Sequence, residues 1–234
     1  MEGRGIYAGY GKIEVLHGAS VRAGQGEIVC IIGPNGSGKS TLLKAMFGLI
    51  KPKRGTVLFD GQDITHLAPE EKVRLGIAFV PQGRNVFTSL TVRENLEMGG
   101  TPLDSKKAVR QAIAEVLETY PLLKDKIPYK AGNLSGGEKQ ILALARADMV
   151  KPRVILMDEP SIGLAPRMIE EVYEKIKAIN TNRGVAFLIV EQNARKALSA
   201  AHRGYVLDLG VTRIEDTGEG LLNNEEVKKL YLGG

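Results

Sequence analysis

Short continuous apolar runs alternate with segments of helical periodicity along most of the chain. The apolar runs are residues 27–32, 77–80, 154–157 and 185–190. The segments with helical spacing of apolar residues are 39–49, 105–120, 139–149, 168–179 and 194–201. A continuous apolar run is typical of a strand buried on both faces. The alternation therefore predicts an α/β fold, with a mostly parallel core sheet and helices on both of its faces.

The two ends of the chain carry a different pattern. Residues 1–31 contain short strands with turn signals at residues 9–11 and 23–26, which predicts a flanking antiparallel β-layer. Near the other end, residues 205–214 are broken at Gly210 and predict a hairpin, and residues 224–230 predict a closing helix. Neither an internal repeat nor a low-complexity linker divides the sequence, so we expect a single domain over residues 1–234.

A glycine-rich motif joins the first apolar run to the first helix. It is Gly33-Pro34-Asn35-Gly36-Ser37-Gly38-Lys39-Ser40, followed by Thr41, and it fits the P-loop pattern Gly-x4-Gly-Lys-Ser. Glycines let backbone N–H groups wrap phosphates at the positive end of a helix. Lys39 would reach the β- and γ-phosphates of a nucleotide, and the Ser40 hydroxyl would bind Mg²⁺.

Two carboxylates follow the apolar run at residues 154–157. Asp158 and Glu159 stand at its carboxyl end, and successive strand residues point to opposite sides. The two carboxylates can therefore have different roles. Asp158 would hold Mg²⁺, and Glu159 would polarise the water that attacks the γ-phosphate. The alternative is a solvated acidic turn, which the preceding P-loop disfavours.

The motif Leu134-Ser135-Gly136-Gly137-Glu138 distinguishes among P-loop proteins. Ser135 and Glu138 form a capping box at the start of a helix, which is a purely structural interpretation. That interpretation leaves Gly136 and Gly137 unexplained, because glycine is unfavourable in a helix. Exposed N–H groups at a helix start suggest a second phosphate site.

With these motifs in this order, the chain resembles the nucleotide-binding subunit of an ABC transporter from end to end. The resemblance implies a head-to-tail dimer, in which each ATP lies between the P-loop of one subunit and the signature of the other. Ser135, Gly136, Gly137 and Glu138 would then contact the partner's ATP. Tyr10 matches the aromatic residue that stacks on adenine. Gln82, after the strand at residues 77–80, matches the glutamine that touches Mg²⁺ and the attacking water.

The resemblance also implies a division of the chain and a set of partners. Residues 1–81 and 151–234 would form the nucleotide core with its β-layer, and residues 82–150 a helical subdomain that ends in the signature helix. The expected partners are a second ATPase subunit, integral membrane permease subunits and, indirectly, a solute-binding protein. The expected location is the cytoplasmic face of the cell membrane.

Departures from the general family pattern indicate a subfamily. Gln192 occupies the position where most relatives have a histidine, and Ala165 the position of an aspartate that bridges the two subunits. With residues 83–87 and 231–234, these features are similar to the F-type ATPase subunit of branched-chain amino-acid uptake systems. Those relatives usually have glutamate in place of Gln82. Three alternatives remain: an importer of another solute, a non-transport ABC ATPase, and a regulatory module that does not hydrolyse ATP.

Composition changes this interpretation little. The 234 residues are 43% hydrophobic and 25% charged, as in ordinary globular proteins. No apolar run approaches the ~20 residues of a membrane span, and the first residues lack an apolar signal core. The net charge of +5 is scattered without an aromatic-interleaved stripe, so we expect no nucleic-acid partner. The single cysteine, Cys30, suits a reducing compartment as a core residue, and the three histidines lack metal-ligand spacing.

Overall fold

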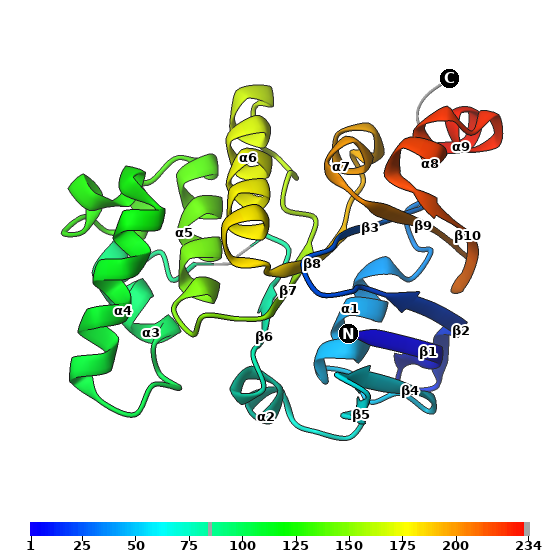
Figure 1. The fold of residues 1–234 in the computed structure, drawn as a ribbon, viewed down its shortest axis with the longest axis horizontal. Helices are drawn as coiled ribbons and strands as arrows, with labels where there is room; N and C mark the ends of the chain where they lie inside the picture. The colour runs from blue at the N-terminus through cyan, green and yellow to red at the C-terminus, as the bar shows by residue number, and fades with distance from the viewer. Residues whose placement is uncertain (84–85, 232–234) are drawn as a thin grey trace.

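The computed structural model describes residues 1–83 and 86–231 (Figure 1). Arg84 and Asn85, within the subfamily feature at residues 83–87, lie outside the described residues, as do residues 232–234. The described part of the chain forms a six-stranded sheet, a four-stranded sheet and helices that pack on them. None of its helices is long and apolar enough to cross a membrane.

The six-stranded sheet is the core of the fold. Its strands are β3 (Ile28–Ile32), β6 (Ile77–Val80), β7 (Val154–Asp158), β8 (Ala186–Val190), β9 (Arg203–Asp208) and β10 (Val211–Thr217). They lie in the order β10-β9-β3-β8-β7-β6, and all neighbours are parallel except the β9–β10 hairpin. Every residue of β3, β7 and β8 is buried, which explains their continuous apolar sequences. The predicted mostly parallel sheet is confirmed.

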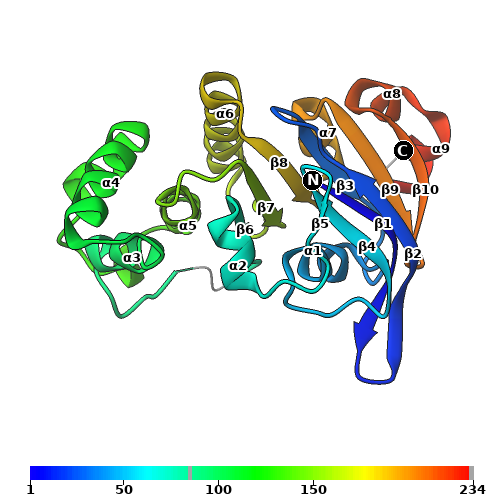
Figure 2. The ribbon, with the colours of Figure 1, turned by 60° about the horizontal axis from the view of Figure 1, so that its bottom comes forward.

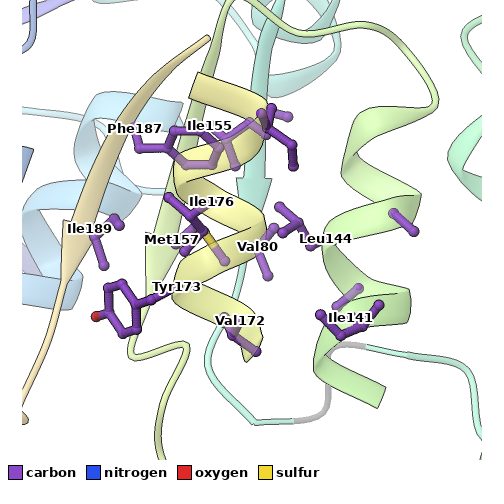
Figure 3. Packing of buried hydrophobic residues seen from close by; sticks show 14 of the residues in the cluster. Val80, Ile141, Leu144, Ile155, Met157, Val172, Tyr173, Ile176, Phe187 and Ile189 are labelled. Carbon is purple, nitrogen blue, oxygen red and sulfur yellow. The ribbon is translucent and has the colours of Figure 1, made fainter. Parts of the chain in front are cut away.

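Alternate residues of these strands enter two separate hydrophobic clusters. Cys30, Ile155 and Phe187 face the first cluster, under α5 (Gly136–Asp148), α6 (Pro166–Arg183) and α7 (Ala194–Ala200). Figure 3 shows side chains of β7 and β8 packed against Val172, Tyr173 and Ile176 of α6. The second cluster lies under α1 (Lys39–Phe47) and the four-stranded sheet. Helices therefore lie on both faces of the core sheet, and the predicted antiparallel layer joins α1 on the second face.

The antiparallel sheet contains more strands than the sequence predicted. Its order is β2-β1-β4-β5, with β1 (Glu2–Tyr10), β2 (Ile13–Arg22), β4 (Arg54–Phe59) and β5 (Gln62–Asp63). In Figure 2 the β1–β2 hairpin extends from the body of the molecule. The strands β4 and β5 were not predicted. Two residues of β4, Val57 and Phe59, are buried, in a cluster shared with residues of β1 and α1.

Within the described residues between β6 and β7 there are five helical segments. They are α3 (Val92–Gly99), α4 (Lys106–Thr119), the 3₁₀ segments η1 (Pro121–Lys126) and η2 (Ala131–Asn133), and α5. The side chains of Thr91, Ser105 and Ser135 cap α3, α4 and α5. Two further helices, α2 (Pro69–Arg74) and α8 (Gly218–Asn223), were not predicted. The closing helix predicted at residues 224–230 is present as α9 (Glu225–Tyr231).

Candidate functional site

The glycine-rich loop follows β3, at the centre of the core sheet, and leads into α1. Two of its glycines are required by their surroundings. A Cβ at Gly33 would lie 2.0 Å from the Leu207 carbonyl oxygen. Gly38 has φ of 101°, and a Cβ there would lie 2.7 Å from Cδ2 of Leu16. Gly38 is also the N-cap of α1 and offers no side-chain acceptor to its N–H groups. These groups remain available to an anion.

The Lys39 side chain folds back over this loop. Its ammonium donates hydrogen bonds to the carbonyl oxygens of Gly33 (2.9 Å) and Pro34 (3.0 Å). Burial lowers the pKa of Lys39, while the charges of Glu159 and Asp158 oppose this shift. The buried Ser37 hydroxyl makes no hydrogen bond within residues 1–83 and 86–231. The loop thus presents one cation and one unused hydroxyl.

Asp158 approaches the same helix from the end of β7. Its Oδ1 accepts a 2.7 Å hydrogen bond from the Ser40 hydroxyl. Its Oδ2 is buried and has no hydrogen-bond partner in the described part of the chain. A buried carboxylate oxygen without a partner is costly, and a cation would satisfy it. Mg²⁺ prefers carboxylate and hydroxyl oxygens, so the pair of Asp158 and Ser40 fits this ion.

Glu159 directly follows β7, and its backbone is left-handed, with φ of 48°. Its N–H donates to the Val190 carbonyl oxygen (2.9 Å), and its Oε2 accepts a 2.7 Å hydrogen bond from the Gln82 amide. A non-glycine residue at positive φ is strained, and such strain gathers at functional sites. Burial raises the pKa of Glu159, and the Lys39 charge partly offsets that rise. Asp158 and Glu159 therefore have different hydrogen-bond partners.

Gln192 follows β8, which lies between β3 and β7. Its amide donates a hydrogen bond to Oδ1 of Asn35, within the glycine-rich loop. A cavity of about 210 Å³ adjoins this contact and is lined by Gly33, Pro34, Asn35, Gln192, Ala194, Leu230 and Tyr231. The structure thus brings Gln192 to the loop from a distant part of the sequence.

The remaining predicted residues occupy three places. Thr41 is buried in the first turn of α1. Tyr10 ends β1 on the hairpin, and half of its surface is exposed. Residues Ser135–Glu138 form the start of α5, and the contacts described above for the glycine-rich loop involve none of them.

The capping box at the start of α5 is confirmed. Glu138 accepts a 2.8 Å hydrogen bond from the Ser135 N–H, and the Glu138 N–H donates to the Ser135 hydroxyl (3.3 Å). The sequence offered no structural reason for Gly137, and here the structure differs. A Cβ at Gly137 would lie 2.1 Å from Cε and 2.9 Å from Cβ of Met168, in the first turn of α6. Packing therefore requires this glycine, whereas Gly136 is exposed.

One buried residue beside the site had no predicted role. Glu191 is only 1% exposed, and its carboxylate accepts hydrogen bonds from the loop after β7, from α6 and from its own turn. In the sequence, Glu191 could have been noticed as a charged residue directly after a continuous apolar strand.

The comparisons with known proteins agree with this geometry. The family model described as ABC transporter matches residues 16–162. The chain is 46% identical to the high-affinity branched-chain amino acid transport ATP-binding protein BraG of Pseudomonas aeruginosa, over 96% of each chain. It is 39% identical to the probable branched-chain amino acid transport ATP-binding protein LivF of Archaeoglobus fulgidus, over 97% of this chain and 96% of the relative.

Solved structures show the same fold. The ADP conformation of MJ1267, an ATP-binding cassette of an ABC transporter, superposes with a TM-score of 0.88 at 30% identity, covering 100% of this chain and 98% of that one. The dimeric structure of MJ0796, a bacterial ABC transporter cassette, gives 0.81 at 29% identity, covering 93% and 98%. The chain therefore belongs to the ABC transporter family, as an ATP-binding subunit.

Proposed function

We propose that this chain powers the uptake of branched-chain or related amino acids by hydrolysing ATP as one half of a dimer. One observation carries the assignment of hydrolysis. The buried Glu159 carboxylate is held by Gln82 beside the Ser40–Asp158 pair, and both carboxylates act on the Lys39 charge. The assignment of the solute rests on the names of the relatives BraG and LivF.

The substrate ATP is held by residues 33–41. Backbone N–H groups of Gly36, Gly38 and the first turn of α1, including Thr41, face its phosphates. The Lys39 ammonium exchanges its bonds to the Gly33 and Pro34 carbonyls for bonds to the β- and γ-phosphates. The half-exposed Tyr10 ring stacks on adenine.

Ser40, Asp158 and Gln82 are the residues that would hold Mg²⁺. The free Oδ2 of Asp158 and the Ser40 hydroxyl supply hard oxygen ligands. The Gln82 side chain donates through its amide nitrogen to Glu159, which leaves its carbonyl oxygen for the ion or for water. When bound, the ion neutralises phosphate charge during phosphoryl transfer.

Glu159 acts as the general base. A water oxygen forms a bond to the γ-phosphorus, the bond from that phosphorus to the ADP oxygen breaks, and the water proton passes to Glu159. A raised pKa makes the carboxylate a stronger base. Gln192 orients the γ-phosphate or the water through its amide, from its place beside Asn35.

The signature residues serve the ATP of a second subunit. Ser135 and Gly136 are exposed at the start of α5, where they are free to meet a partner. Glu138 holds the first turn of α5 through its capping bonds and an ion pair of 2.9 Å with Lys126. The dimeric relative MJ0796 supports this arrangement.

The second subunit has the same or a related sequence. The ATPase dimer contacts integral membrane permease subunits at the cytoplasmic face of the membrane, and the permease in turn meets a solute-binding protein. Residues 82–150 act as a helical subdomain on a nucleotide core formed by residues 1–81 and 151–234. The helices inserted between β6 and β7 support this division.

Transport in proteoliposomes tests the whole proposal. The tagged chain is purified from membranes, and the permease that accompanies it is reconstituted with its solute-binding protein. We expect ATP-driven uptake of labelled leucine, isoleucine or valine, and none with Glu159→Gln. Uptake of an unrelated solute but of no branched-chain amino acid would contradict the solute assignment while leaving the ATPase assignment intact.

A further inference from the structure

Glu191 directly precedes Gln192 and bonds to Ser161, in the loop that carries Glu159. Its N–H donates to the Ile31 carbonyl oxygen (3.1 Å), which attaches it to the central strand β3. Its side chain is buried, and neither Mg²⁺ binding nor proton transfer in the proposed mechanism uses it. A buried carboxylate with no assigned role requires a physical explanation, because its desolvation is costly.

Five donors satisfy this carboxylate. Oε1 accepts from the Ser161 N–H (2.9 Å) and from the Tyr173 hydroxyl of α6 (3.2 Å). Oε2 accepts from the Ser161 hydroxyl (2.8 Å), the Gln192 N–H (3.1 Å) and the Asn193 N–H (3.3 Å). Three of the donors are backbone N–H groups, which cannot reverse their role. The arrangement therefore requires an acceptor at both oxygens.

The donors come from both sides of the candidate site. Ser161 stands two residues after Glu159, in the loop that leaves β7, and is itself buried. Gln192 and Asn193 form the turn that leaves β8, where Asn193 also caps α7. One carboxylate thus joins the turn that bears Gln192 to the loop that bears Glu159.

We propose that Glu191 is a positioning residue, which holds Gln192 at the glycine-rich loop by anchoring its turn to Ser161. This inference rests on the proposed ATPase function. The Gln192 amide reaches Asn35 only while its own backbone stays in place, and the Gln192 N–H is one of the five donors. A displacement of about 1 Å in such a group can cost on the order of 100-fold in rate.

Glu191→Gln is the sharpest perturbation, because it keeps the shape and removes one acceptor. If the amide nitrogen replaces Oε2, it faces the N–H groups of Gln192 and Asn193. If it replaces Oε1, it faces the N–H of Ser161. Either orientation places donor against donor, so the glutamine cannot satisfy the pocket that the carboxylate satisfies.

The matched control is Tyr173→Phe. It removes one donor to Oε1, on the α6 side, and leaves the bonds to Ser161 and Gln192 in place. In the purified full chain we expect Glu191→Gln to lower kcat for MgATP about tenfold or more, with KM within about threefold. Tyr173→Phe stays within about twofold of the parent. Equal losses in both variants would overturn the inference, since the Tyr173 hydroxyl donates to Glu191 and the bonds to Ser161 and Gln192 do not depend on it.

A double-mutant cycle separates positioning from a general loss of structure. If Glu191 acts through Gln192, Glu191→Gln has little further effect on kcat in a Gln192→Ala background, less than about threefold. Independent, multiplicative losses would overturn the inference, as would a Gln192→Ala variant as fast as the parent.

If Glu191→Gln does not fold, the same cycle uses Ser161→Ala, for which we expect a loss of about three- to tenfold in kcat. A Ser161→Ala variant with the parent kcat would then overturn it.

A failure of the proposed function can be distinguished from a failure of this inference. If Glu159→Gln hydrolyses ATP as fast as the parent, the base assignment is wrong, and the positioning of Gln192 for that chemistry fails with it. If Glu159→Gln is inactive while folded Glu191→Gln retains the parent kcat, the ATPase mechanism stands and this inference alone is wrong.

Discussion

Replacing Glu159 by glutamine tests the centre of the proposed mechanism. The substitution keeps the length of the side chain and its left-handed backbone, and the oxygen of the new amide can still accept the hydrogen bond from Gln82. ATP affinity should therefore stay within a few-fold of the parent. The amide cannot accept the proton of the attacking water, so the chemical step loses its base.

The expected loss is large. General base catalysis is worth on the order of 100- to 10,000-fold, which corresponds to about 3–5 kcal/mol of activation free energy. Phosphate release by the purified chain measures kcat, and nucleotide titration measures affinity. With hydrolysis blocked, ATP-bound dimers should accumulate and be seen by size-exclusion chromatography. The exposed Glu219, changed to glutamine, is a control that leaves the site untouched.

The pH dependence of the parent gives a second test. Burial raises the pKa of Glu159, and only the ionised carboxylate is a base. The rate should therefore be full above this raised pKa and fall as the pH drops through it, with a midpoint above that of an ordinary glutamate. If Glu159→Gln hydrolysed ATP within a few-fold of the parent, the assignment of the base would be refuted.

Further predictions concern binding, assembly and stability. Lys39→Ala should weaken ATP binding itself in a titration, because its charge pairs with phosphates in ground and transition states alike. Mixing the Lys39→Ala and Ser135→Arg subunits should restore part of the ATPase activity, since one of the two composite sites in the mixed dimer is intact. ATPase activity that depends on neither residue would contradict sites shared between two subunits. Arg183→Leu should lower the free energy of unfolding by about 3 kcal/mol in urea, because it leaves the buried Asp148 carboxylate without its ion pair. Burial lowers the pKa of Lys72 to about 8, so the unfolded chain binds its proton more tightly. Stability should rise from about pH 8 upward by at most about 1.4 kcal/mol per pH unit, and Lys72→Met should lose this rise.

Much of the site was accessible from sequence because its signals are local. A strand, a glycine-rich turn and a helix in succession identify the glycine-rich loop, and two acids after an apolar strand identify Asp158 and Glu159. The capping box formed by Ser135 and Glu138 predicted the start of α5 correctly. Even the errors at element ends have local causes. The first helix ends at Phe47, two residues before the predicted end, because Gly48 adopts a left-handed conformation.

Contacts between distant segments could not be predicted in this way. The strand β4 pairs with β1, and its Val57 and Phe59 are buried in a cluster shared with residues of β1 and α1. Lys72 resembles any surface lysine in the sequence, but α2 buries it against the Met46 carbonyl oxygen at the end of α1. Burial of a polar side chain depends on which elements pack together, and the spacing of apolar residues does not specify that.

The sequence by itself determined the chemistry that this chain can offer, because phosphate-binding glycines, a lysine and paired carboxylates are recognisable wherever their immediate neighbours are right. Only the tertiary structure decided how those groups are held. It showed that Gly137 is required by the approach of Met168, and that Gln192 reaches Asn35. It also showed that the Glu191 carboxylate ties two loops together through Ser161. The physical reason is that hydrogen bonds and van der Waals contacts depend on distances in space, and parallel strands bring together residues far apart in the sequence.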